Sequence, residues 1–261
     1  MSHVSSAVVA LPIVLICSVD LELSPLLAHL SSVQPLRVRA RQGWRGEIAD
    51  RSILAVAGGM GKTNAAHTLT AILEAHRVAG IVGFGVAGAY PSSGLATESV
   101  AVAERQIYGD EGVRTPEGWW SCEGIGIPLV EDAAAPIFND FPIEESAVDV
   151  IVGALAGAGI SAARGPFVTV SCCSGTRAAG EELEQRFGAI CETMEGAAYA
   201  HVARLYDVPY VEIRGISNLV EDRDFTRWRL AQAAAAAADA TAIAAGAWHP
   251  RSASSIATVQ T

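Results

Sequence analysis

Four side chains fall at positions where the chain could bring them to one site, and together they could break a bond between a sugar and a base. Glu22 follows the first apolar segment, Glu195 opens a predicted helix, and Arg214 and Asn218 end a later apolar segment. A carboxylate can take a proton from water, and a second one can accept hydrogen bonds from two sugar hydroxyls. An amide can donate to a departing base. Cleavage of an N-glycosidic bond needs these functions, because its transition state resembles an oxocarbenium ion.

Each of these residues also has an ordinary structural interpretation. Glu22 could merely place negative charge in the first turn of a helix, and Glu195 could do the same in a later helix. Arg214 could be a strand arginine with a partner at the surface. These alternatives stay open for any single residue. A carboxylate, an arginine and an amide at one predicted sheet edge nevertheless favour a ligand site there.

Apolar segments predict the sheet that would position these side chains. Such segments are typical of strands buried on both faces of a parallel sheet, and they occupy residues 7–19, 79–84, 166–171 and 209–216. Residues 36–57 alternate between apolar and polar side chains and predict short antiparallel strands. Helical segments separate the apolar runs, so the predicted class is α/β. In that class, ligands bind at the carboxyl ends of the parallel strands.

Two glycine-rich segments are predicted at the same edge. Gly58 to Gly61 lie between a strand and a helix, and Gly85 to Ala89 follow another strand. Glycines allow backbone amides to approach a ligand closely, so Gly59, Gly85 and Ala87 are candidate substrate contacts. A tight turn without a ligand is the alternative. The first segment is not a phosphate-binding Walker A loop, because that motif requires glycine where this chain has Val56.

Composition favours a small ligand over a macromolecule. The chain has 261 residues and a net charge of −10 without a basic cluster, which argues against nucleic acid and anionic membranes as partners. The five cysteines lack metal-ligand spacing, and no histidine pattern indicates a metal. Cysteine usage and the absence of a recognisable signal peptide predict a cytoplasmic protein. The alanine-rich segment 230–248 contains Asp239 and predicts a packed helix, not a membrane span. Asp224 can cap this final helix.

No linker divides the chain, so we expect one domain over residues 1–250, followed by a disordered tail over residues 251–261. Residues 112–141 are irregular and predict a long excursion that acts as a lid or a subunit contact. We expect a homo-oligomer in which Trp119 and Trp120, or a neighbouring loop, contact a partner copy.

Two motifs resemble the nucleoside phosphorylase and nucleosidase superfamily. They are MEGAA at residues 194–198 and VPYVEIRGISN at residues 208–218. This resemblance implies a three-layer α/β/α fold around a central mixed, largely parallel twisted sheet. It implies that Glu195 binds both ribose hydroxyls and that Met194 lies under the sugar. The segment Ser18 to Glu22 resembles the start of bacterial 5′-methylthioadenosine nucleosidases, in which the glutamate activates water and an arginine matching Arg214 steadies it.

A longer set of segments resembles the futalosine hydrolases of menaquinone biosynthesis. The segments are 167–171, which begins with Phe167 and Val168, 174–176, 192–198, 214–218 and 223–224 with Trp228; residues 87–91 and 107–112 agree as well. The resemblance implies hydrolysis that releases hypoxanthine from a nucleoside with a 5′ aromatic carboxylic acid, without a metal or an organic cofactor. Trp228 stands where related nucleosidases have a residue that lines the pocket for the 5′ group, so it could stack on the aromatic tail; simple helix packing is the alternative. Arg223 would suit the carboxylate.

Asn218 stands where adenine-cleaving nucleosidases carry aspartate. An asparagine always has donors, so it can serve N7 or O6 of hypoxanthine, although it can also pair with adenine. Two rivals remain open. One is phosphorolysis in the same fold, which Asp20 and Glu22 disfavour because their charge repels phosphate. The other is a nucleoside-binding protein without catalysis, since a fold does not determine a function.

Overall fold

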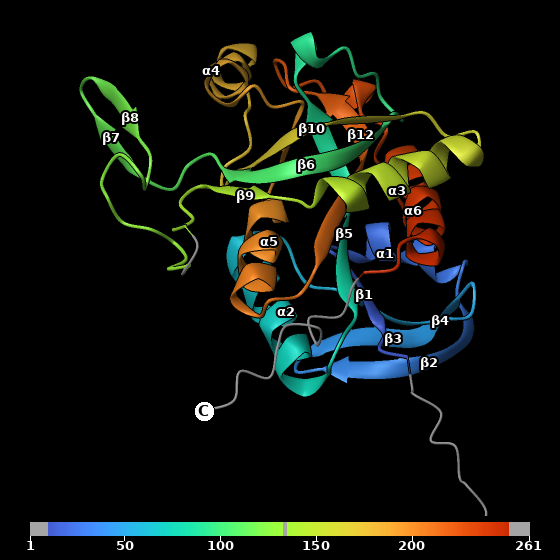
Figure 1. Cartoon of the computed structure of the whole chain (residues 1–261). Coiled ribbons are helices and arrows are strands. Elements are labelled where there is room, and N and C mark those ends of the chain that lie inside the picture. Colours follow the sequence, from blue (N-terminus) through green and yellow to red (C-terminus); the bar gives the residue numbers. More distant parts are fainter. Residues whose placement is uncertain (1–9, 133–134, 251–261) are drawn as a thin grey trace, which may run out of the picture.

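The computed structural model describes residues 10–132 and 135–250 (Figure 1). The predicted tail over residues 251–261 lies outside this range. The strands are β1 (Ile13–Cys17), β2 (Ser31–Val38), β3 (Arg41–Ile48), β4 (Arg51–Ala57), β5 (Gly80–Ala89), β6 (Val100–Tyr108), β7 (Val113–Thr115), β8 (Gly118–Trp120), β9 (Asp140–Pro142), β10 (Ala162–Thr169), β11 (Cys191–Thr193) and β12 (Tyr210–Leu219). The helices are α1 (Asp20–Leu27), α2 (Lys62–Ala75), α3 (Glu145–Gly157), α4 (Arg177–Phe187), α5 (Gly196–Leu205) and α6 (Leu230–Ala247), with 3-10 turns η1 (Pro91–Ser93) and η2 (Phe225–Arg227).

One mixed sheet forms the centre of the described protein. Its order is β11-β10-β6-β12-β5-β1-β4-β3-β2, and β9 pairs with β6. The pairs β1–β4, β1–β5, β5–β12, β6–β10 and β10–β11 are parallel, whereas the pairs β2–β3, β3–β4 and β6–β12 are antiparallel. The predicted α/β class and its central mixed sheet are confirmed. The predicted antiparallel strands within residues 36–57 are confirmed as well.

The short strand β11 closes part of this sheet on itself. It pairs in parallel with β10 and in antiparallel with the end of β5, so Glu192 lies opposite Gly88. Because β10, β6, β12 and β5 are already joined in that order, these five strands form a continuous ring. The ring brings the end of β11 and the start of α5 to the carboxyl edge of β5.

Helices cover both faces of the sheet. Helix α6 packs on β12 and β5 together with α1 and α3, whereas α2 packs against α5 on the opposite side (Figure 1). The core strand β1 is completely buried, as its unbroken apolar sequence predicts. Helix α6 is long and apolar enough to cross a membrane by length and composition, but half of it is buried within the protein. The structure therefore agrees with the predicted packed terminal helix.

Two predicted boundaries were wrong. The glycine-rich segment after residue 84 was expected to leave the strand, but it is the second half of β5, because Gly88 and Ala89 pair with β12 and β11. Asp224 was expected to cap the final helix. Its carboxylate instead accepts a hydrogen bond from the Thr226 N–H at 3.0 Å at the start of η2, and α6 begins at Leu230.

The predicted excursion within residues 112–141 contains a hairpin of β7 and β8 that projects from the body of the protein (Figure 1). Trp119 packs edge-on against Phe187, with ring centroids 5.5 Å apart. Trp120 is 51% exposed. A contact of this hairpin with a second copy stays a prediction.

Candidate active site

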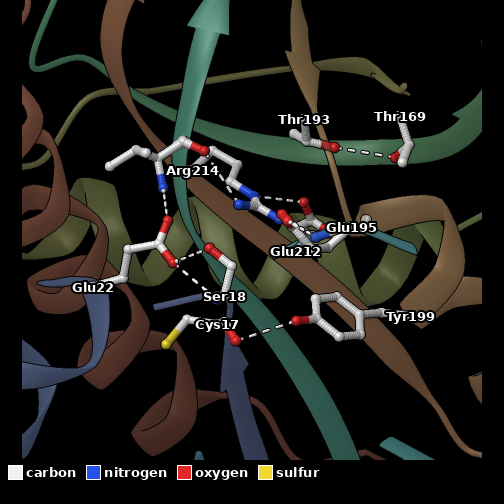
Figure 2. Close-up of polar contacts among 12 residues, drawn as sticks. Cys17, Ser18, Glu22, Thr169, Thr193, Glu195, Tyr199, Glu212 and Arg214 are labelled. Carbon is white, nitrogen blue, oxygen red and sulfur yellow. Dashed lines mark hydrogen bonds and ion pairs between the residues drawn. The ribbon is translucent and has the colours of Figure 1, made fainter. Parts of the chain in front are cut away.

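Glu22 is held by the chain turn at the end of β1. Its Oε2 accepts hydrogen bonds from Ser18 N at 2.9 Å, Ser18 Oγ at 2.8 Å and Val19 N at 3.2 Å. Its Oε1 accepts from Val86 N at 2.8 Å, across the sheet edge (Figure 2). Glu22 therefore does cap the first turn of α1, in agreement with its ordinary structural role at the start of a helix. It is also 2% exposed and reaches the edge of β5, which a cap alone does not require.

Arg214 lies opposite Gly85 in the pairing of β12 with β5. Its Nε donates to Glu212 Oε1 at 2.6 Å, and its Nη1 donates to Val86 O at 3.2 Å. Nη2 is buried and has no hydrogen-bond partner within the described residues, although it lies 3.7 Å from Glu195 Oε2. Burial would lower the pKa of Arg214, but nearby carboxylates, Glu212 foremost, raise it overall. The side chain is therefore a fixed cation with one N–H group free to contact a ligand.

Gly85 is required for this arrangement. A Cβ at this position would lie 2.7 Å from the Glu22 carboxyl carbon and 2.8 Å from Arg214 Nη1. Its φ of +148° is also unfavourable for other residues. Any side chain would therefore displace both charged groups. Ala87, also a predicted contact, accepts a hydrogen bond from Ser217 Oγ through its backbone oxygen at 3.2 Å.

Glu195 is positioned by the junction between β11 and α5. It is the N-cap residue of α5, and its Oε1 accepts a hydrogen bond from Gly61 N at 2.8 Å. Gly61 has a φ of +88°, which glycine tolerates. Burial raises the pKa of Glu195, while Arg214 and the Gly61 amide oppose the rise. Met194 precedes it and is half-buried.

Asn218 lies near the end of β12, next to an irregularity in the pairing with β5. Its Oδ1 accepts a hydrogen bond from Ser217 Oγ at 2.8 Å, and its Nδ2 donates to Leu219 O at 3.0 Å. It is paired with Gly88, two residues beyond the Val86 amide that binds Glu22. Two residues of a strand span about 7 Å. The structure therefore brings Glu22 and Asn218 to one edge of the sheet. Their points of contact with β5, Val86 and Gly88, are separated by a distance comparable to the length of a sugar-base unit.

A cavity of about 370 Å³ opens beside Asn218. Trp228 and Arg223, the two residues expected near a 5′ group, both line it. The Arg223 guanidinium lies 5.2 Å from the Trp228 ring centroid. The rest of the lining is Ala96, Thr97, Ser174, Leu219, Glu221, Asp222, Asp224, Thr226, Arg227 and Arg229. Among the described residues, the lining includes Asn218 but not Glu22, Glu195 or Arg214.

Three further predicted contacts are Phe167, Val168 and Gly59. Phe167 and Val168 are completely buried in β10. The Gly59 N–H donates to Ser18 O at 2.8 Å, beside the turn that holds Glu22. Contact of these residues with a substrate stays a prediction.

Several groups that hold this site were not predicted from the sequence. Ser18 and the backbone of Val86 bind Glu22, the Gly61 amide binds Glu195, and Glu212 binds Arg214. A charged residue inside an otherwise apolar strand was the available signal for Glu212. No sequence signal marks the Val86 backbone. In the described part of the chain, no three His, Cys, Asp or Glu side chains are grouped so that they could hold a metal ion.

Comparisons with known proteins show similarity over most of the chain. The sequence profile of the Phosphorylase superfamily matches residues 12–245. A futalosine hydrolase from Thermus thermophilus is 34% identical over 198 residues, which cover 76% of this chain and 82% of that protein. A 5′-methylthioadenosine/S-adenosylhomocysteine nucleosidase from Halalkalibacterium halodurans is 25% identical over 206 residues, 78% of this chain and 84% of that one.

A solved structure shows the same fold. The structure of a futalosine hydrolase mutant from Helicobacter pylori superposes with a TM-score of 0.77 at 20% identity, covering 90% of this chain and 98% of that chain.

Proposed function

Because this chain belongs to the phosphorylase superfamily, we propose that it is an N-glycosyl hydrolase that cleaves futalosine to hypoxanthine and dehypoxanthine futalosine, in menaquinone biosynthesis. The observation that carries the proposal is the buried cluster of Glu22, Arg214 and Glu195 beside Asn218 at one edge of β5. The futalosine hydrolase from Thermus thermophilus supports the choice of substrate.

In the proposed mechanism, Glu22 activates water. Its carboxylate is fixed by the Ser18 and Val86 donors, so a proton acceptor stands ready at the sheet edge. Base catalysis of this kind contributes about 10²–10⁴-fold. The free Nη2 of Arg214 orients the water beside it. Glu195 accepts hydrogen bonds from the ribose hydroxyls, and Met194 lies under the sugar.

The charges of the cluster suit this chemistry. Three buried carboxylates, Glu22, Glu195 and Glu212, surround the single guanidinium of Arg214. Positive charge that develops on the sugar in an oxocarbenium-like transition state is stabilised by such a surplus of negative charge. The Asn218 amide donates a hydrogen bond to the purine as negative charge appears on the departing base. Trp228 and Arg223 extend the site toward the 5′ group through the adjacent cavity.

A 5′-methylthioadenosine nucleosidase is the second candidate, since relatives with that name match a similar share of the chain. The deciding experiment incubates the protein with futalosine, inosine and methylthioadenosine and identifies each liberated base. We expect hypoxanthine from futalosine at the highest rate. Faster release of adenine from methylthioadenosine would replace the proposed substrate.

Phosphorolysis is tested by the same assay with and without phosphate. Asp20 and Glu22 at the start of α1 place negative charge beside the attack site, which disfavours a phosphate nucleophile. Turnover that requires phosphate would overturn hydrolysis. Saturable binding of all three nucleosides without release of any base would instead establish a binding protein.

A further inference from the structure

Three residues of β12 form a buried polar chain that leads to the active site. Tyr210, Glu212 and Arg214 are spaced by two, so they project from the same face of the strand. The Tyr210 hydroxyl donates to Glu212 Oε2, and Arg214 Nε donates to Glu212 Oε1 at 2.6 Å (Figure 2 shows the second contact). Glu212 is 0% exposed and Arg214 is 1% exposed. The carboxylate is thus bound on both sides within the core.

The surrounding backbone leaves room for this chain. A Cβ on Gly196 would lie 2.6 and 2.7 Å from the two Glu212 oxygens, and a Cβ on Gly83 would lie 2.6 Å from the Tyr210 hydroxyl. Burying a carboxylate is costly even when it is paired, and apolar residues of similar volume are often at least as stable there. Stability alone therefore does not account for a glutamate in the middle of this strand.

Glu212 restricts the Arg214 guanidinium to one orientation. With Nε bound to Glu212 and Nη1 bound to Val86 O, both the plane of the group and its rotation are fixed. The remaining nitrogen, Nη2, is left without a hydrogen bond in the part of the chain described and lies 3.7 Å from Glu195 Oε2. A free arginine would otherwise be drawn into direct contact with either of those carboxylates.

We propose that Glu212 is a positioning residue, which holds Arg214 so that one N–H group stays available to the water and sugar between Glu22 and Glu195. This inference rests on the proposed function and extends it to a residue that does not contact the substrate. Glu212 also balances the charge of Arg214, so that Glu22 and Glu195 keep their surplus of negative charge.

The first variant is Glu212→Ala, which removes both the hydrogen bonds and the charge. We expect kcat to fall by about 10–100-fold, the range found when supporting residues of a site are removed, with a smaller change in KM. The control is Glu104→Gln, which removes a carboxylate paired with Arg164 at the surface and should leave kcat unchanged. Wild-type kcat in a folded Glu212→Ala protein would overturn the proposal.

The second variant, Glu212→Gln, keeps the shape and an acceptor oxygen but removes the charge. Ionisable groups that face Glu212 are Tyr210, Cys191, Glu195 and Arg214. Loss of the negative charge of Glu212 lets Arg214 stabilise ionised Glu195 more strongly, which lowers the pKa of Glu195. The acid limb of the pH profile of kcat/KM should therefore move to lower pH. A merely structural role would leave this limb in place. An unshifted limb together with wild-type kcat would overturn the proposal even if Glu212→Ala fails to fold.

Crystal structures of the two variants show the position of the Arg214 guanidinium directly, without a measurement of activity. We expect Arg214 to leave Val86 O in Glu212→Ala and to turn toward Glu195 or Glu22. An unchanged guanidinium would contradict the proposal, whichever nucleoside the protein cleaves. Absence of base release by the wild-type protein would instead reject the proposed function, so the two failures are distinguishable.

Discussion

Replacing Gly85 with alanine tests the geometry of the site most directly. The new methyl group would lie 2.7 Å from the Glu22 carboxyl carbon, whereas carbon atoms in contact are about 3.5–4.0 Å apart. Glu22 or the strand must therefore move by about 1 Å. A displacement of that size in a reacting group lowers the rate on the order of 10²-fold. Overpacking typically costs about 1–3 kcal/mol of folding stability.

The assay measures base release and thermal unfolding of Gly85→Ala beside a matched control, Gly159→Ala. Gly159 has a φ of +81° but nothing within 4 Å of an added Cβ, so its replacement introduces backbone strain without a contact. We expect the control to lose about 1 kcal/mol of stability and no activity. Gly85→Ala should lose at least 10²-fold in kcat. Retention of wild-type kcat by a folded Gly85→Ala protein would refute the reasoning that Glu22 acts from its position beside Gly85.

Three further predictions concern the reacting groups themselves. Glu22→Gln should lower kcat by about 10²–10⁴-fold, measured by base release, and unchanged turnover would remove Glu22 from the mechanism. Asn218→Ala should lower kcat by about 10²–10³-fold, and Asn218→Asp should lose less on an adenine nucleoside than on a hypoxanthine nucleoside; equal losses would contradict its role at the base. Burial raises the pKa of Glu195, and protonation removes the acceptor for the ribose hydroxyls. As the pH is lowered, kcat/KM should therefore begin to fall before the pH reaches the ordinary glutamate pKa of about 4.3. A pH profile that is flat down to that value would contradict the assignment.

The sequence was sufficient to predict the sheet and the meeting of distant polar residues. The apolar run at residues 209–216 identified most of β12, because strands covered on both faces need continuous apolar sequence. Glu22 and Asn218 were placed at one edge because parallel strands end on the same side. The short strand β11 was not predicted, since three residues carry no periodicity and its pairing with β5 is a long-range contact.

The supporting contacts of the site were harder to predict. Which backbone amide binds Glu22 depends on the register of β5, and a sequence pattern does not fix that register to a single residue. The complete burial of Phe167 and Val168 could not be predicted from a resemblance of segments, which does not report the direction of a side chain. Glu212 was visible as a charge in an apolar strand. Its partners became clear only once the strand face and the two facing glycines were known.

The ring formed by β5, β12, β6, β10 and β11 has a consequence for how products leave. A site built between two free strand ends could open by letting those ends separate, but here each strand is bonded on both sides within the ring. Arg214 lies on a ring strand and Glu195 directly follows one, so we expect these two residues to keep their mutual distance through the reaction cycle, with Glu22 tied to the ring by its hydrogen bond from Val86 N. Entry and exit then depend on the segment from Glu221 to Arg229 that lines the cavity, and its motion, not that of the sheet, would limit turnover.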